Sequence, residues 1–291
     1  MKTFKQKLEA RWVKGKFLCV GLDPDLDKFP VHLKKYDIEE QLVSFFTDIV
    51  VSTSNIVAAF KPNTAFFEGF GAPGISAYEA ICHYIKEFHP RAVLICDAKR
   101  ADIGKTNFGS VKFLFDRCRA DAVTVNPYFG KEALRPFLNR AGKGVFVLCR
   151  TSNQGAEEFQ SRNVEISYGE AIAFKLPPSA KHIPFYQLVA ARVSNFWNEK
   201  DNCGLVTGAT YPEEIKNVRQ VAPKLPLLIP GIGTQGGDLE KSVRSAFVRG
   251  GGFLISSSSD ILYASQGKDF AKAARAKAEE LDKKIRALIM K

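Results

Sequence analysis

The sequence predicts an α/β fold, a (β/α)8 TIM barrel, from three observations. Short β-rich runs recur eight times along the 291 residues, helical patterns separate them, and polar or turn residues follow most of the runs. Alternating strands and helices are typical of right-handed βαβ units, and eight such units close into a barrel. We therefore expect residues 1–291 to form a single domain whose functional groups gather at the carboxyl ends of the strands.

Each predicted strand is a short apolar run bounded by polar or turn residues. The runs are 17–22, 56–60, 92–96, 122–125, 144–149, 204–207, 227–229 and 253–255. Between the first two runs, apolar side chains recur with a helical period over residues 38–53, which predicts a helix there.

The connection between the fifth and sixth strands is longer than the others. It runs from Ala156 to Cys203, and its first part, residues 157–184, is polar and interrupted by Pro177-Pro178. A loop of this length is usually a lid or a flexible insertion, so we expect irregular structure there. Residues 188–197 then resume a helical pattern.

Composition places the chain among globular proteins, with 45% hydrophobic and 25% charged residues. We expect no membrane span because no apolar run approaches the required length, and the N-terminus has no apolar signal region. The six cysteines are scattered without a CxxC pair. They are therefore predicted to be core thiols in a reducing compartment, which favours a cytoplasmic location.

A formal net charge of +11 favours anionic partners: nucleic acid, an anionic membrane surface or a phosphorylated metabolite. The basic residues are dispersed along the sequence, and the one dense cluster is a C-terminal helical segment, residues 272–291, that has the pattern of a solvated face. Without a basic stripe interleaved with aromatic residues, nucleic-acid binding is the weaker interpretation.

The most informative stretch follows the third predicted strand, where Asp97, Lys99, Arg100 and Asp102 crowd the expected start of a helix. Charges this close are costly to desolvate unless they neutralise one another, and such arrangements are often kept for chemistry. Taken alone, these charges favour two interpretations equally: an active site, or a solvated strand end whose charges cap the following helix.

Five segments together resemble one known family. The run Asp97-Ala98-Lys99-Arg100-Ala101-Asp102-Ile103-Gly104-Lys105-Thr106 resembles the signature of the orotidine 5′-phosphate decarboxylases. Four further segments resemble that family's strand ends, in the same order and over nearly the whole chain. They are residues 20–25, 59–63, 150–153 and 230–237. The long subtype of the family, type 2, is the most similar.

The resemblance implies decarboxylation of orotidine 5′-monophosphate to UMP, the last step of de novo pyrimidine synthesis, without a metal or an organic cofactor. The four histidines agree with the absence of a metal, since they show no ligand spacing. By resemblance Lys99 protonates pyrimidine C6, Asp97 lies beside the substrate carboxylate, and Lys61 and Asp102 complete a chain of alternating charges. A fixed cation beside C6 stabilises the negative charge that develops there.

The resemblance also assigns the groups that bind the substrate. Those named by the family's pattern are Asp23 and Lys61 for the ribose, Ser152 for the pyrimidine ring, Gln235, Gly236 and Gly237 for the 5′-phosphate, and Ile103, Thr106, Ser258 and Ser259 as further contacts. In this family Asp102 and Thr106 reach the neighbouring subunit's site, so a homodimer is implied. In some organisms the same domain is fused to orotate phosphoribosyltransferase.

One departure from the family pattern concerns the phosphate. The subtype usually reads Ser-Ser-Arg after the eighth strand, whereas this chain places Ser259 at the arginine position. Losing a bidentate, charge-assisted contact predicts weaker binding of the phosphorylated substrate unless Arg249 or Lys241 compensates.

Three other interpretations stay open. The barrel could be a Schiff-base sugar-phosphate aldolase using Lys61 or Lys99, although the flanking aspartates favour a charged Lys99. It could be a nucleotide-binding barrel with impaired activity. Nucleic-acid binding rests on net charge alone.

Overall fold

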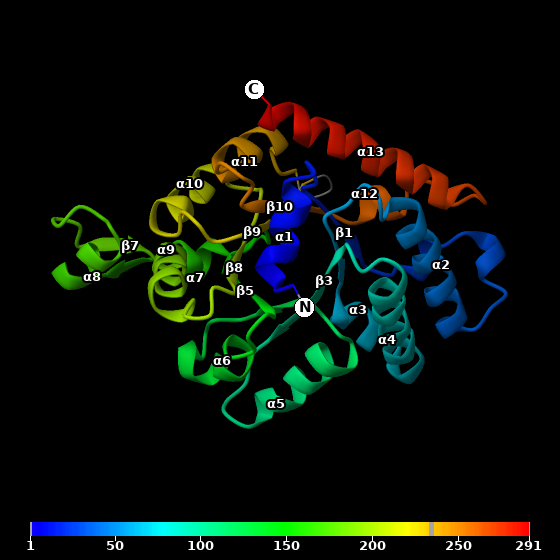
Figure 1. Ribbon diagram of the computed structural model, residues 1–291, viewed down its shortest axis with the longest axis horizontal. Helices are drawn as coiled ribbons and strands as arrows, with labels where there is room; N and C mark the ends of the chain where they lie inside the picture. The colour runs from blue at the N-terminus through cyan, green and yellow to red at the C-terminus, as the bar shows by residue number, and fades with distance from the viewer. Residues whose placement is uncertain (1, 233–235, 291) are drawn as a thin grey trace.

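The computed structural model describes residues 2–232 and 236–290, and these residues contain a closed barrel of eight parallel strands (Figure 1). The order around the barrel is β1-β10-β9-β8-β5-β4-β3-β2, which confirms the predicted (β/α)8 architecture. The barrel strands are β1 Leu18–Leu22, β2 Ala59–Pro62, β3 Val93–Arg100, β4 Ala122–Val125, β5 Gly144–Arg150, β8 Cys203–Thr207, β9 Leu227–Ile229 and β10 Phe253–Ser257.

Helices surround the barrel, and α2 fills the residues predicted to form a helix. Its first turn is capped by Asp37, whose carboxylate accepts the backbone N–H of Glu40 at 2.9 Å. The helices are α1 Phe4–Trp12, α2 Ile38–Thr53, α3 Thr64–Glu68, α4 Gly71–Phe88, α5 Thr106–Val111, α6 Gly130–Leu138, α7 Glu157–Gln160, α8 Tyr168–Ala173, α9 Phe185–Arg192, α10 Pro212–Val221, α11 Leu239–Ala246, α12 Ser259–Leu262 and α13 Phe270–Ile289. Short 3-10 turns cover Leu26–Lys28 and Val31–Leu33, and π-helical segments cover Lys112–Arg117 and Val193–Trp197.

The amino-terminal end of the barrel is closed by α1, which crosses the front of the strands in Figure 1. Phe4 is buried and meets Phe146 of β5 edge to face at 5.4 Å, and the indole N–H of Trp12 donates to the Phe253 carbonyl oxygen at 2.9 Å. The opposite, carboxyl end of the barrel is left free to hold ligands.

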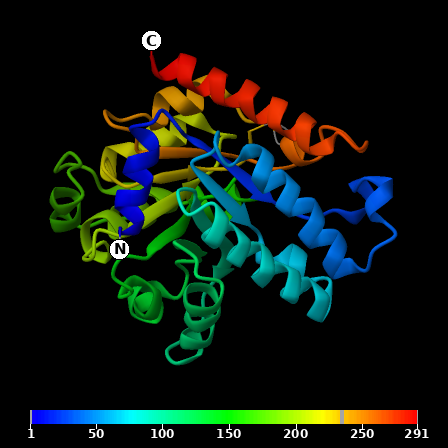
Figure 2. The same ribbon diagram turned by 45° about the vertical axis from the view of Figure 1, so that its right-hand side comes forward.

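The long connection is more ordered than the sequence indicates, so the expectation of irregular structure over residues 157–184 is wrong. It contains α7, α8 and a two-stranded antiparallel sheet of β6 Asn163–Glu165 and β7 His182–Pro184, which lies outside the ring of barrel helices (Figures 1 and 2). The reason is local: Ser167 and Glu170 form a capping box that starts α8. Residues 188–197 are helical as predicted, within α9 and the π-helical segment that follows.

The third strand also differs from prediction. It continues past Cys96 to Arg100, through an irregularity in its pairing with β4, so Asp97 and Lys99 lie on the strand itself. Lys99 has a φ of 46°, and this left-handed backbone is rare for a residue with a side chain. Its N–H donates to the Thr124 hydroxyl at 2.9 Å, so a tertiary contact holds the strained conformation.

The six cysteines are buried and free of disulfides, as predicted for core thiols. In the described part of the chain, no helix has both the length and the apolar character needed to cross a membrane.

Candidate active site

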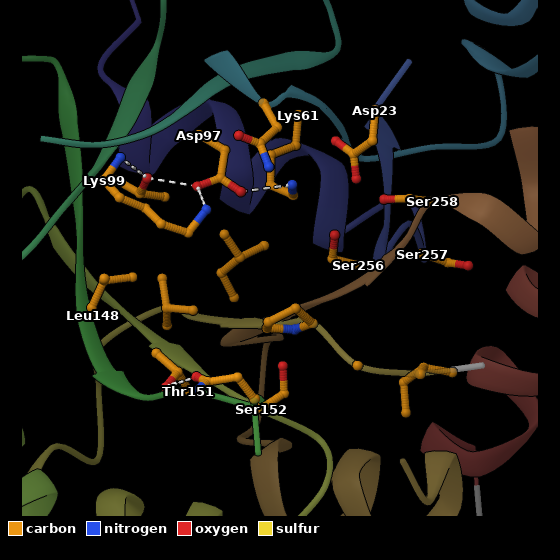
Figure 3. Close-up of a pocket in the computed structure, with 18 of the residues that line it drawn as sticks. Asp23, Lys61, Asp97, Lys99, Leu148, Thr151, Ser152, Ser256, Ser257 and Ser258 are labelled. Carbon is orange, nitrogen blue, oxygen red and sulfur yellow. Dashed lines mark hydrogen bonds and ion pairs between the residues drawn. The ribbon is translucent and has the colours of Figure 1, made fainter. Parts of the chain in front are cut away.

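A cavity of about 640 Å³ lies at the carboxyl end of the barrel, and each of the eight strands or the loop that follows it contributes to its lining. Its described lining residues are Asp23, Lys61, Asn63, Phe66, Asp97, Lys99, Thr124, Leu148, Thr151, Ser152, Asn153, Gln160, Val206, Leu228, Pro230, Gly231, Ile232, Ser256, Ser257, Ser258, Ser259 and Asp260. Figure 3 shows Asp97 between two lysines, with Asp23 and the serines of β10 on one side and Ser152 across the cavity.

Asp97 is the centre of the charged cluster. Its carboxylate is bound by the Lys61 ammonium at 2.8 Å through one oxygen and by the Lys99 ammonium at 2.8 Å through the other. The Thr124 hydroxyl also donates to Asp97 at 2.8 Å, and through its contact with the Lys99 N–H it links the two residues. The carboxylate is thus held in one orientation by three donors.

The two lysines differ in exposure. The side chain of Lys61 is 7% exposed and that of Lys99 is 48% exposed, so Lys99 is the cation that projects into the cavity. Burial alone would lower the pKa of Lys61, but the carboxylates of Asp97 and Asp23 outweigh burial, and the pKa is raised. Burial alone would raise the pKa of Asp97, but Lys61 and Lys99 hold it well below its usual value. Asp97 and Lys61 are therefore both charged at neutral pH.

Two glycines bring other polar groups close to this cluster. A Cβ on Gly21 would lie 1.9 Å from the Ser258 hydroxyl oxygen, so only glycine lets Ser258, which follows β10, lie against β1. A Cβ on Gly208 would lie 2.8 Å from backbone and side-chain atoms of Ser152, which ties the loop after β5 to the end of β8 in the same way. Asp23 lines the cavity with a buried carboxylate oxygen, Oδ1, that has no partner in the described structure.

Seven of the residues predicted from the sequence share this cavity, namely Asp23, Lys61, Asp97, Lys99, Ser152, Ser258 and Ser259. Asp102, Ile103 and Thr106 do not line it and are exposed, and the Asp102 carboxylate accepts its neighbour's N–H. Gly236 and Gly237 lie beside the cavity rather than on its wall, because the Gly237 N–H donates to Gly231, which does line it. Gln235 lies outside the described residues.

The cations suggested as substitutes for the missing arginine do not reach the cavity. Lys241 pairs with Asp238 at 3.3 Å, and Arg249 precedes β10, at the amino-terminal end of the barrel. Among the described lining residues only Lys61 and Lys99 are cationic, and Asp260 adds a carboxylate next to Ser259.

Sequence reasoning missed Thr124 and Gln160. Thr124 is the one polar side chain in β4, and a single polar residue within an apolar run can be recognised in the sequence. Gln160 ends α7 and exchanges hydrogen bonds of 2.9 Å with Thr151, so part of the long connection returns to the cavity. Arg150, quoted only as part of a motif, is buried and pairs with Glu214 at 2.5 Å, which anchors the loop that carries Ser152.

No three His, Cys, Asp or Glu side chains within the described ranges come together in a geometry that could hold a metal ion. The polar side chains of the cavity carry two ammonium groups, carboxylates, hydroxyls and amides.

Comparison with known proteins identifies the family. Residues 16–276 match the Orotidine 5'-phosphate decarboxylase / HUMPS family. The orotidine 5'-phosphate decarboxylases of Janthinobacterium sp. (strain Marseille) and Cellvibrio japonicus (strain Ueda107) are 44% and 41% identical, over 96% and 97% of this chain and 96% and 98% of theirs.

Solved structures agree with this assignment. The OMP decarboxylase of Leishmania donovani is 32% identical, with a TM-score of 0.78 over 98% of this chain and 99% of that chain. The UMP synthase of L. donovani is 34% identical with a TM-score of 0.81, and this chain spans 57% of its length. The chain described here belongs to the orotidine 5'-phosphate decarboxylase / HUMPS family.

Proposed function

We propose that this chain decarboxylates orotidine 5′-monophosphate to UMP, and that Lys99 delivers the proton to C6. The observation that carries the proposal is the Lys61–Asp97–Lys99 cluster, in which two cations fix one ionised carboxylate at the mouth of a barrel cavity. Family membership supplies the substrate class.

The cluster suits a reaction that creates a carbanion. When the bond from C6 to the carboxylate breaks, its electron pair stays on C6 and CO2 leaves. An ammonium group held beside C6 stabilises that negative charge and then gives it a proton, which completes UMP. Lys99 has the required position and charge, because its ammonium is bound to Asp97 and exposed to the cavity.

Asp97 has two roles in this scheme. It keeps Lys99 in place, and its negative charge lies where the substrate carboxylate would be placed, so repulsion between the two is relieved as CO2 leaves. The buried Lys61 offsets part of the charge of Asp97 and prevents it from taking up a proton.

The remainder of the cavity accommodates a nucleotide. We assign the ribose hydroxyls to Asp23, whose buried oxygen lacks a partner, and to Lys61. Ser152, on the opposite wall, is assigned to the pyrimidine ring. The 5′-phosphate then faces Gly231, Ser258 and Ser259, with Gly236 and Gly237 behind them.

Because this phosphate end lacks a described cation and contains Asp260, we expect a high KM for orotidine 5′-monophosphate. Ser259→Arg restores a bidentate cation and should lower KM by about tenfold with little change in kcat. Ser259→Gln, which adds length without charge, is the matched control and should leave KM high. The measurement is the KM of the three proteins by steady-state kinetics. An unchanged KM in Ser259→Arg contradicts the assignment of the 5′-phosphate to this end of the cavity.

We further propose that the active unit is a homodimer, in which Asp102 and Thr106 reach the partner's cavity and Ile103 contacts its substrate. Supporting this, Asp102 is exposed and lies outside its own cavity. Ile103 is 67% and Phe108 58% exposed, and α5 lies against α6, which follows the exposed Tyr128 and Phe129. An exposed apolar patch of this kind marks an interface.

Mixing two inactive variants tests the dimer. Equal amounts of Lys99→Ala and Asp102→Ala protein, dissociated and reassembled together, should recover roughly a quarter of the wild-type turnover, because half of the dimers carry one intact composite site. Lys99→Ala mixed with Asp97→Ala is the control and should recover nothing, since both residues lie in the same cavity. Equal recovery in the two mixtures, or none in either, argues against shared sites.

The Schiff-base aldolase is the second candidate, because lysines lie at strand ends in this barrel. Its nucleophile must lose its proton, whereas the pKa of Lys61 is raised and Lys99 is ion-paired. Incubation with a sugar phosphate and borohydride, followed by mass spectrometry, should give no adduct, while orotidine 5′-monophosphate should give UMP by chromatography. A stable adduct on Lys61 or Lys99 would overturn the decarboxylase assignment.

Two broader expectations belong with this proposal. A cytoplasmic location is supported by six free, buried thiols, which suit a reducing compartment. A fusion to orotate phosphoribosyltransferase stays a prediction, and the longer UMP synthase of L. donovani is the relative that makes it worth examining.

A further inference from the structure

A second cavity, of about 590 Å³, lies at the amino-terminal end of the barrel, opposite the active site, and we call it the basal cavity. It is lined by Lys2, Lys7, Ala10, Arg11, Lys14, Lys86, Pro90, Arg91, Phe115, Arg119, Asp121 and Lys143. Eight of these side chains are cationic and one is a carboxylate, so the basal cavity concentrates a large part of the chain's net positive charge.

These cations come from segments that are far apart in the sequence. Four lie in or next to α1, two lie near the end of α4, and the remaining two precede β4 and β5. The position of α1 across the end of the barrel brings the segments together (Figure 1). Basic residues that are dispersed along the sequence are thus gathered in space at this end of the barrel.

The single carboxylate is already occupied. Asp121 is buried and binds Lys7 at 2.5 Å and Lys86 at 2.8 Å, and it accepts the Leu94 N–H at 2.9 Å. In the described structure, no carboxylate lies within ion-pairing distance of the other cations of the cavity, including Lys14, Arg91 and Arg119. The basal cavity therefore carries positive charge that no acidic side chain balances.

Arg11 adds a second, independent observation. It is 95% buried and lines the cavity, and its terminal nitrogen donates to the carbonyl oxygens of Val57 and Ser54. Its Nε is buried without a hydrogen-bond partner among the described residues. Burial and the nearby Arg91 lower the pKa of Arg11, as expected where like charges are held together. An anionic ligand in the cavity would offset the positive charge that Arg11 and Arg91 hold together.

We propose that the basal cavity binds a polyphosphate anion, of the class of pyrophosphate and the nucleoside triphosphates. Several cations around one concave site match a ligand with several charges better than a single phosphate. Phe115, the aromatic residue that lines the basal cavity, is 2% exposed and so offers no ring face for a nucleic-acid base. This inference does not depend on the proposed decarboxylase activity.

Calorimetric titration of the full chain with pyrophosphate tests the proposal. Lys14→Glu/Arg91→Glu alters two exposed, unpaired cations of the cavity and should weaken binding by about tenfold or more. Lys272→Glu/Lys283→Glu makes the same charge change on exposed positions of α13 and should bind like the wild type. Both double variants should retain wild-type turnover of orotidine 5′-monophosphate, which shows that they fold.

Two further titrants define the ligand class. ATP should compete with pyrophosphate, because the polyphosphate chain is the recognised group, and orthophosphate should bind at least about tenfold more weakly. Three results would overturn the proposal: no binding of pyrophosphate by the wild type, an unchanged affinity in Lys14→Glu/Arg91→Glu, or tighter binding of single-stranded DNA than of pyrophosphate with loss of DNA binding in that variant.

Discussion

Replacing Lys99 with alanine is expected to lower turnover of orotidine 5′-monophosphate by a factor of about 10⁴ or more. In the proposed mechanism the change removes both the proton donor and the cation that stabilises charge at C6, and each effect contributes orders of magnitude. The fold should persist, because the Lys99 side chain is half exposed and the buried Lys61–Asp97 pair is left intact.

Lys99→Arg separates the two effects. A guanidinium keeps the positive charge next to Asp97 but does not give up a proton at ordinary pH. Its turnover should fall by about 10² or more, yet exceed that of Lys99→Ala. Lys283→Ala, an exposed lysine on α13, is the control and should match the wild type. The single-turnover rates of the four proteins are compared. A rate for Lys99→Ala within tenfold of the wild-type rate would exclude Lys99 as the proton donor.

Replacing Asp97 with alanine should abolish turnover and also destabilise the fold. The buried Lys61 ammonium would lose its nearest anion, and removing one partner of a buried ion pair costs about 3–5 kcal/mol. Urea unfolding at pH 7 should reveal this loss. Asp97→Asn keeps hydrogen-bonding atoms and should be the less destabilised of the two variants, although it too should lose turnover.

The pH dependence of that loss follows from the pKa of Lys61. In the wild type this pKa is raised, so the pair stabilises the fold below the unfolded lysine value of about 10.4 and this contribution is lost as pH rises through the folded value. Without Asp97 the folded pKa of Lys61 is lower. The stability difference between variant and wild type should therefore shrink as pH rises from about 7 toward about 11. A constant difference would show that Lys61 does not depend on the charge of Asp97.

At acid pH the stability contributed by the ion pair changes with pH in the opposite direction. Because the pKa of Asp97 is lowered in the folded protein, its contribution to stability is present above the unfolded value of about 3.9 and is lost as pH falls through the folded value. The ion pair is thus intact over the whole physiological range, which is what a permanently charged catalytic cluster requires.

The sequence was sufficient to predict the barrel because each buried parallel strand is a short apolar run. Seven predicted site residues lie in one cavity because they lie at or after the ends of such runs. It was not sufficient for the end of β3, where the left-handed Lys99 depends on a hydrogen bond from β4. The capping box of Ser167 and Glu170 could have been recognised from the spacing of these residues in the sequence, but it was not predicted.

The basal cavity could not be predicted from the sequence for a different reason. Lys14, Arg91 and Arg119 are separated by long stretches of sequence, and each looks like an ordinary surface cation by itself. The pairing of β3 with β4 brings Arg91 and Arg119 to the same end of the barrel, and α1 adds Lys14 to them. The proposed role of Asp102 in a partner's cavity could not be derived from one chain for a similar reason, since it depends on a second chain.

The most direct test of the account is turnover of orotidine 5′-monophosphate followed by ultraviolet absorbance in the presence of a chelator, with wild type beside Lys99→Ala. We expect the wild type to convert the substrate to UMP at a rate that the chelator does not change, and we expect no detectable conversion by Lys99→Ala over the same time. No conversion by the wild type, or conversion that Lys99→Ala retains, would contradict it and would point to a barrel that binds nucleotides without processing them.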